Sequence, residues 1–171
     1  MSQVMTTSTD LSLARVEGLH RRDAFRTAGL PGRFDGATMA GIPDLWDRFV
    51  AMFPVAGQRG GETYGLCLGS DKDEGGFAYV AAVQIDAVAP APAGLEVRDI
   101  PAQSYVVFRQ ALAAGPLQPQ MRAAAQEIWG QRLAALGLTP SGGPDFELYP
   151  AGFDPQNLED AHVEYWAPVI P

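Results

Sequence analysis

Apolar positions along the chain repeat at helical spacing in two segments. Over residues 42–53, and again over 119–136, apolar side chains recur every three or four positions, which places them on one stripe of a helix. Pro54 closes the first helix, and Gly137 is a typical C-terminal stop for the second. We expect the tryptophan on each stripe to lie in the core. The stripes consist of Ile42, Leu45, Trp46, Phe49, Val50 and Phe53 in the first helix, and of Met121, Ala125, Ile128, Trp129, Leu133 and Leu136 in the second.

Shorter apolar runs between and after these helices predict strands. The segment 11–30 has room for a first strand, but its pattern is ragged, and the strand-like segment 95–110 is split by Pro101. The clearer strands are expected over residues 63–68, 77–86, 145–150 and 162–169.

The order strand, helix, strand, strand therefore occurs twice along the chain. A connector rich in Pro and Ala, residues 87–94, separates a half of about 11–88 from a half of about 95–171. This pattern predicts an α+β fold of two similar units, with their helices on the outside and a cleft between their sheets. Clefts of this kind are common binding sites.

The charge of the chain argues against nucleic-acid binding. The formal net charge is −8, and Lys72 is the only lysine, so no basic cluster is present to displace counterions from phosphates. No apolar run approaches the length of a membrane span. Residues 1–10 are polar, unlike a signal peptide, and are expected to form a disordered tail. The single cysteine, Cys67, fits a core position in a reducing cytosol, which predicts a cytoplasmic protein.

The sequence offers no motif for a metal or a cofactor. Asp71, Asp73 and Glu74 are spaced too closely for a calcium loop and are expected at a solvated hairpin tip. His20 and His162 lack the spacing of metal ligands. Glycine-rich nucleotide motifs and a GxSxG elbow are absent, so we expect neither a metal nor a cofactor.

Glu147 is the first candidate for chemistry. It lies between Phe146 and Leu148 in the strand DFELY, where side chains alternate between two faces. If its two neighbours pack on the helices, Glu147 and Tyr149 face the cleft. A carboxyl group in an apolar cleft has a raised pKa, and it can pair with a cation or act as a general acid or base. The alternative is a solvated glutamate on an edge strand.

Three further aromatic residues are candidates for the walls of the same cleft. Trp166 lies in the last strand, which is expected beside DFELY, and an indole face can hold a cation. The phenols of Tyr79 and Tyr105 can donate a hydrogen bond to a ligand carbonyl or position a water beside Glu147. For each of the three, packing in the core is the alternative reading.

Seven short segments resemble, in order and spacing, the GyrI-like family, also described as the AraC-type effector-binding domain. The resemblance covers the chain from about Leu11 to Pro171. The segments are IPDLW (42–46), TYGLC (63–67), FAYVAAV (77–83), PAGLEVRDIPAQSYVVF (92–108), EIWGQRL (127–133), DFELY (145–149) and EYWAPV (164–169).

The resemblance implies two units related by a pseudo-twofold axis, an antiparallel sheet and a ligand cleft between the units. It matches Glu147 to the buried pocket glutamate of the family and Trp166, just before Pro168, to its pocket aromatic. Members fused to DNA-binding domains receive lipophilic cations, whereas others stand alone. The residues before Leu11 are too few for a helix-turn-helix domain, so a stand-alone bacterial member is expected.

Three functions follow as hypotheses. The first is a sensor or sequestering protein that binds lipophilic, cationic or planar aromatic molecules through Glu147, Trp166, Tyr149, Tyr79 and Tyr105. The second is a hydrolase of cyclopropane-bearing alkylating compounds, in which Glu147 activates water and Tyr105 or Tyr149 binds the substrate carbonyl. The third is an inhibitor whose protein partner is a topoisomerase such as DNA gyrase. This hypothesis ranks last, because the net charge is only moderate for a surface that imitates DNA.

Overall fold

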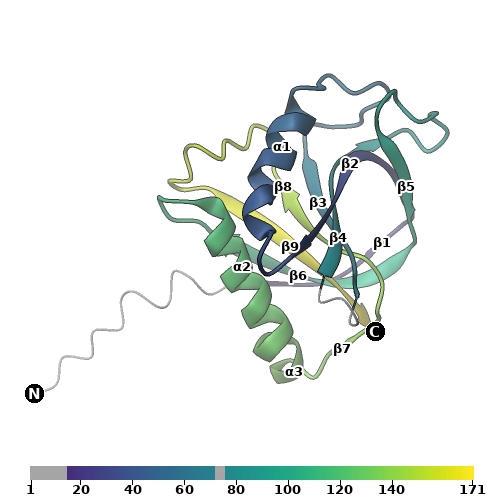
Figure 1. Ribbon diagram of the computed structural model, residues 1–171. Coiled ribbons are helices and arrows are strands. Elements are labelled where there is room, and N and C mark those ends of the chain that lie inside the picture. Colours follow the sequence, from purple (N-terminus) through teal and green to yellow (C-terminus); the bar gives the residue numbers. More distant parts are fainter. Residues whose placement is uncertain (1–14, 72–75) are drawn as a thin grey trace, which may run out of the picture.

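One antiparallel sheet organises the molecule (Figure 1). The computed structural model describes residues 15–71 and 76–171, so the predicted tail and the tip of the acidic loop lie outside the described residues. Within that part, the strands follow the order β1-β6-β9-β8-β3-β4-β2-β5, and β7 pairs with β9. The strands are β1 (Arg15–Arg22), β2 (Phe25–Asp35), β3 (Thr63–Asp71), β4 (Gly76–Ile85), β5 (Glu96–Ile100), β6 (Gln103–Ala111), β7 (Thr139–Pro140), β8 (Asp145–Tyr149) and β9 (His162–Ile170).

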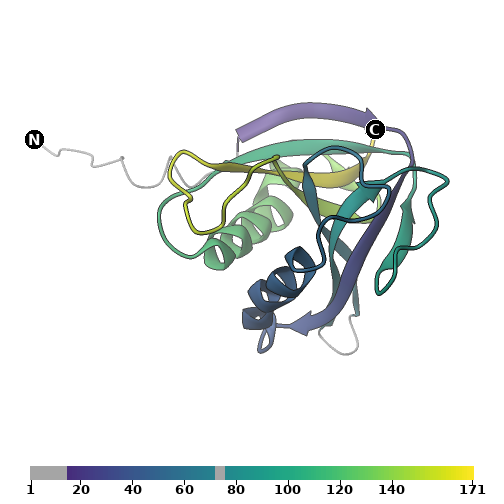
Figure 2. The same cartoon turned by 90° about the horizontal axis from the view of Figure 1, so that it is seen from above.

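Two main helices complete the α+β fold that the sequence predicts. The helix α1 (Ile42–Val50) follows a short turn, η1 (Met39–Gly41), and ends three residues before the predicted position. Val50 and Phe53, expected on its apolar stripe, are exposed. The helix α2 (Leu117–Glu127) continues through a π-helical segment, η2 (Ile128–Arg132), into α3 (Leu133–Ala135). Figure 2 shows both helices on the same side of the sheet.

The two halves of the chain share one sheet, which corrects the expected pair of sheets. The strands β3 and β8 meet at its centre, where Gly65 lies opposite Glu147 and Cys67 lies opposite Asp145. On either side of this junction the strand order is the same for the two halves, as a pseudo-twofold axis between β3 and β8 requires. In place of a cleft between two sheets, the molecule has one sheet face on which both α1 and α2 pack.

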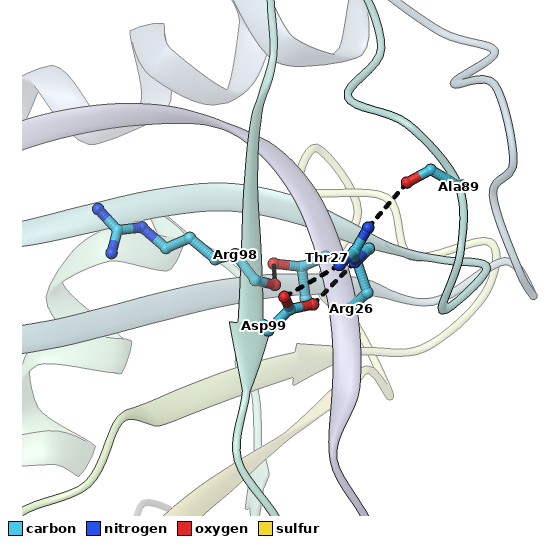
Figure 3. Close-up of polar contacts among 5 residues, drawn as sticks. All are labelled: Arg26, Thr27, Ala89, Arg98 and Asp99. Carbon is cyan, nitrogen blue, oxygen red and sulfur yellow. Dashed lines mark hydrogen bonds and ion pairs between the residues drawn. The ribbon is translucent and has the colours of Figure 1, made fainter.

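Among the described residues, the first half has one strand more than the sequence pattern indicated and the second half has two more, one of them the two-residue β7. The first strand of each half pairs with a strand of the other half. The ragged segment 11–30 contains β1 and the start of β2, which are separated by two residues, and β1 pairs with β6 of the other half. In return, β5 pairs with β2. Figure 3 shows how β5 is attached: the guanidinium of Arg26 binds the carboxylate of Asp99 at 2.8 Å, and the hydroxyl of Thr27 donates to the carbonyl of Arg98 at 3.0 Å.

The sheet is apolar on both faces, so the core has three clusters. The helix α2 covers the strands of the second half, and α1 covers those of the first half. The third cluster lies on the opposite face and contains no helical residue among its buried members, which are Phe25, Tyr64, Leu66, Val80, Ala82, Ile100, Tyr105, Val107 and Phe146. Helices therefore cover only one of the two faces.

Candidate functional site

Glu147 lies buried on the sheet face that carries the helices. Its side chain is 8% exposed, and Tyr149 on the same face packs into the cluster around α2. Phe146 and Leu148 point the other way and join the cluster without helices. The alternation along β8 is as the sequence predicts, but the assumption that Phe146 and Leu148 pack on the helices is wrong. The carboxylate therefore lies on the sheet face that α1 and α2 cover.

Two phenols hold the carboxylate of Glu147. The hydroxyl of Tyr79 donates to Oε1 at 2.9 Å, and the hydroxyl of Tyr149 donates to Oε2 at 2.9 Å. The indole N–H of Trp46, on α1, donates to the hydroxyl of Tyr79 at 3.0 Å. The ring of Trp46 also meets that of Tyr149 edge-on, with centroids 5.4 Å apart. A chain of hydrogen bonds therefore connects α1 to the carboxylate.

Burial makes Glu147 a carboxyl group that titrates near neutral pH. Desolvation raises its pKa to about 7, although the hydrogen bonds from Tyr149 and Tyr79 act in the opposite direction. Desolvation also raises the pKa of both phenols well above the ordinary value, so they remain hydrogen-bond donors. No ion pair among the described residues includes Glu147, so its negative charge is countered only by neutral donors.

The absence of a side chain at position 65 allows this arrangement. Gly65, in β3, lies opposite Glu147 in the sheet. A Cβ at this position would lie 2.6 Å from Oε1 of Glu147 and closer still to the hydroxyl of Tyr79. Since both atoms are buried and hydrogen-bonded, neither can move away without breaking the contact between them. Gly65 is therefore part of the site through the volume that it leaves open.

A second carboxylate lies two residues before the first, on the same face of β8. The hydroxyl of Tyr165 donates to the carboxylate of Asp145 in a short hydrogen bond, and the indole N–H of Trp129 donates to that hydroxyl at 2.8 Å. Cys67 also hydrogen-bonds Asp145 through its thiol. Desolvation raises the pKa of Asp145 to about 6, although these hydrogen bonds lower it.

Of the five predicted ligand-binding residues, the structure brings three together. Glu147, Tyr79 and Tyr149 form one cluster on the helix face. Trp166 and Tyr105 lie on the opposite face, where their rings are 5.4 Å apart. The predicted catalytic pairing of Glu147 with Tyr105 is therefore not made, because the sheet separates the two side chains.

Trp166 does meet a cation, but the cation belongs to the chain itself. The indole stacks on Phe146 with an angle of 16° between the rings. The guanidinium of Arg22 lies 5.6 Å from the Trp166 ring and 3.8 Å from the ring of Phe25. Arg22 also donates to the hydroxyl of Tyr64 at 2.9 Å. The guanidinium of Arg22, in β1, thus occupies the position among these aromatic rings that a ligand cation was expected to take.

Besides Gly65, four residues with aromatic or carboxyl side chains in the site were missed by the sequence analysis. Trp46 and Trp129 were expected as core residues, yet each donates to a tyrosine, and Trp129 is 40% exposed on the π-helical segment. The signal for Asp145 was its spacing of two from Glu147, which places both on one face of a strand. Tyr165 gave a similar signal, because it alternates with Trp166 in β9.

A groove opens at the N-terminal ends of the two helices. Its volume is about 440 Å³, and its lining includes Met39 and Pro43 on one side and Pro119 and Arg122 on the other. Among the described residues, no group of three or more His, Cys, Asp or Glu side chains is arranged to hold a metal ion. Within the same residues, no helix is long and apolar enough to cross a membrane.

Solved structures share this fold at low sequence identity. The structure of SAV2435 bound to tetraphenylphosphonium superposes with a TM-score of 0.70 at 22% identity, over 91% of this chain and 94% of that one. The integron cassette protein VCH_CASS2 of Vibrio cholerae gives a TM-score of 0.63 at 20% identity, over 92% and 99% of the two chains.

Sequence comparison extends this likeness to a regulator and to a family. The chain is 31% identical over 173 residues to the transcriptional regulator BrlR of Pseudomonas aeruginosa, and it spans 62% of the length of that relative. Residues 19–169 match the Cass2 family, whose description is integron-associated effector binding protein. These matches confirm the predicted likeness to effector-binding domains. The chain therefore belongs to the Cass2 family of integron-associated effector-binding proteins.

Proposed function

We propose that this effector-binding domain takes lipophilic aromatic cations between α1 and α2, with Glu147 as the counter-charge. The single observation that carries the proposal is a buried carboxylate held only by phenols, with no cationic partner among the described ion pairs. An isolated buried charge is costly. The carboxyl group of Glu147 therefore stays protonated and neutral until a bound cation replaces the proton.

The surroundings of Glu147 suit an aromatic cation. The rings of Tyr79, Tyr149 and Trp46 lie around the carboxylate, and ring faces attract cations by about 0.5–2 kcal/mol for each contact. The fold is shared with SAV2435, which was solved with the lipophilic cation tetraphenylphosphonium. We infer that this chain uses the same kind of compound as an effector, in a sensing or sequestering role like that of the regulator domains it resembles.

Titration calorimetry with tetraphenylphosphonium tests the proposal. We expect the wild-type protein to bind it, and Glu147→Gln to weaken binding at least about tenfold, because the buried counter-charge is lost while the shape is kept. The matched control is Glu159→Gln, which removes the same charge from an exposed position in the loop before β9. Binding by Glu147→Gln as tight as that of the wild type would rule out this role for Glu147.

A neutral compound separates charge recognition from simple apolar binding. Triphenylphosphine oxide carries aromatic rings on phosphorus like the phosphonium but has no net charge. We expect it to bind more weakly than the phosphonium to the wild type, and the difference to vanish in Glu147→Gln. Equal binding of both compounds to the wild type would mean that the pocket selects by shape and not by charge.

Hydrolysis of cyclopropane-bearing compounds is a second candidate. The favouring observation is that the pKa of Glu147 is raised to about 7, which suits a general base at neutral pH. Tyr149, hydrogen-bonded to Glu147, is the phenol placed to bind a substrate carbonyl, whereas Tyr105 lies on the other face. Mass spectrometry of a strained substrate incubated with wild type and Glu147→Gln tests it. Inhibition of a topoisomerase stays a prediction.

A further inference from the structure

Asp145 is a half-buried carboxylate near Glu147 to which the proposed function assigns no part. Both side chains project from the same face of β8, two residues apart. At the rise of a strand, two residues correspond to about 7 Å. The charge of Asp145 is felt at Glu147, since it contributes to the raised pKa of that carboxyl group. The two groups therefore belong to one electrostatic site.

The two carboxylates are held in the same manner by different helices. Glu147 is bonded by Tyr79, whose hydroxyl accepts from Trp46 on α1. Asp145 is bonded by Tyr165, whose hydroxyl accepts from Trp129 on the π-helical segment. Each helix thus contributes one indole that reaches one carboxylate through one phenol. A ligand lodged between the helices would have both carboxylates below it.

Neither carboxylate has a basic partner. Among the ion pairs of the residues that the structure describes, none includes Asp145 or Glu147, and their hydrogen-bond donors are neutral: phenols, a thiol and the backbone N–H of Asp145. With both groups ionised, two negative charges without a basic partner would lie about 7 Å apart on the same face of β8. One bound cation balances only one of them, and the remaining charge is stabilised by a second positive centre.

We infer that Asp145 is a second specificity-determining residue of the pocket, so that the site prefers aromatic ligands with two cationic centres along β8 over ligands with one. This inference rests on the proposed function, because it requires that cations bind at Glu147. It names the class of effector more narrowly, as a flat dication whose charges are separated by one or two aromatic rings. Glu147 alone would select for charge but not for the number of charges.

A matched pair of probes tests the inference. N,N′-dimethyl-4,4′-bipyridinium carries two charged nitrogens at opposite ends of two rings, and N-methyl-4-phenylpyridinium has the same rings with one charge. We expect the wild-type protein to bind the dication about tenfold more tightly than the monocation in calorimetry, in keeping with one additional charge pair in a partly desolvated site. In Asp145→Asn the preference should fall to about one, with monocation affinity changed less than about threefold.

The control variant is Asp154→Asn, which removes one negative charge from an exposed loop. It should keep the wild-type preference for the dication. Equal preference in Asp145→Asn and the wild type, or an equal loss for both probes, would overturn the inference. Failure of the monocation to bind the wild type at all would instead overturn the proposed function, so the two failures are distinguishable.

Proton release supplies a second measurement that needs no variant at Asp145. Binding measured at about pH 6 in buffers of different ionisation enthalpy counts the protons released with each probe. Since each carboxyl group must ionise to pair with a positive centre, the dication should release more protons than the monocation. Equal proton release by the two probes would show that Asp145 does not respond to the second charge, and the inference would fail even if Asp145→Asn did not fold.

Discussion

The two halves of the molecule build the same aromatic support but not the same chemistry. In the first half, Trp46 donates to Tyr79. In the second, Trp129 donates to Tyr165. In the sheet, Tyr79 lies opposite Cys67, whereas Tyr165 lies opposite Glu147. A cysteine thus takes the place in one half that the carboxylate has in the other.

The same difference is repeated one step along the central strands. Two residues before Cys67 is Gly65, and two residues before Glu147 is Asp145. Among the described residues, the carboxyl groups with a raised pKa are these two, and both belong to β8. The pseudo-twofold fold therefore supplies two equivalent Trp–Tyr pairs. On β3 the equivalent positions hold the small residues Gly65 and Cys67, and on β8 they hold the two carboxyl groups. The comparison teaches that the site is directional although the scaffold is symmetric.

The largest test of this comparison is the pH dependence of stability. Burial raises the pKa of Glu147 to about 7 and that of Asp145 to about 6, above their ordinary values. On these two groups the folded state therefore holds protons that the unfolded state has lost. The stability that they contribute is highest at acidic pH and is lost as pH rises toward 7. Glu147→Gln should be more stable than the wild type at neutral pH by about 2–3 kcal/mol and nearly equal to it at about pH 4.

Urea unfolding at both pH values measures this difference. Glu159→Gln, with its exposed side chain, should follow the wild type at both. If the difference in unfolding free energy between Glu147→Gln and the wild type does not change with pH, the pKa of Glu147 is not raised. The claim that the second half carries a desolvated acid would then be wrong.

A smaller effect is expected from filling the space on β3. Gly65→Ala brings a methyl group against the carboxylate of Glu147 and the hydroxyl of Tyr79. We expect a loss of about 2 kcal/mol in the free energy of unfolding, typical of overpacking a buried site. Gly130→Ala is the control, because a Cβ there meets no atom within 4 Å. Wild-type stability of Gly65→Ala would show that the first half does not need a small residue here.

The smallest effect compares the two tryptophans directly. Trp46→Phe and Trp129→Phe each remove one N–H donor from a buried tyrosine hydroxyl. We expect Trp46→Phe to cost about 1 kcal/mol and Trp129→Phe less, because Trp129 is 40% exposed and water can replace its donor. Thermal unfolding of the two variants gives the order. A larger loss for Trp129→Phe would contradict the view that the hydrogen bond of Trp46 is the better shielded from water.

Much of the fold could be predicted because it depends on local periodicity. The helices and the strands from β3 onward, except the unpredicted β7, lie close to the predicted ranges, and the Pro/Ala-rich connector falls between β4 and β5. The exchange of β1 and β5 could not be predicted, because strand pairing depends on partners far apart in the chain. The segment 11–30 looked ragged since Gly18 interrupts β1 with a bulge and two residues separate β1 from β2.

The sequence by itself determined that Glu147 and Tyr149 share one face of a strand, because side chains alternate with a period of two. It did not determine which face meets the helices, since both faces of this sheet are apolar. Only the tertiary structure decided that Trp46 and Trp129 bond the tyrosines that hold the carboxylates. It also decided that Trp166 and Tyr105 lie on the opposite face of the sheet. Periodicity fixes which residues go together, and packing between distant segments fixes what they meet.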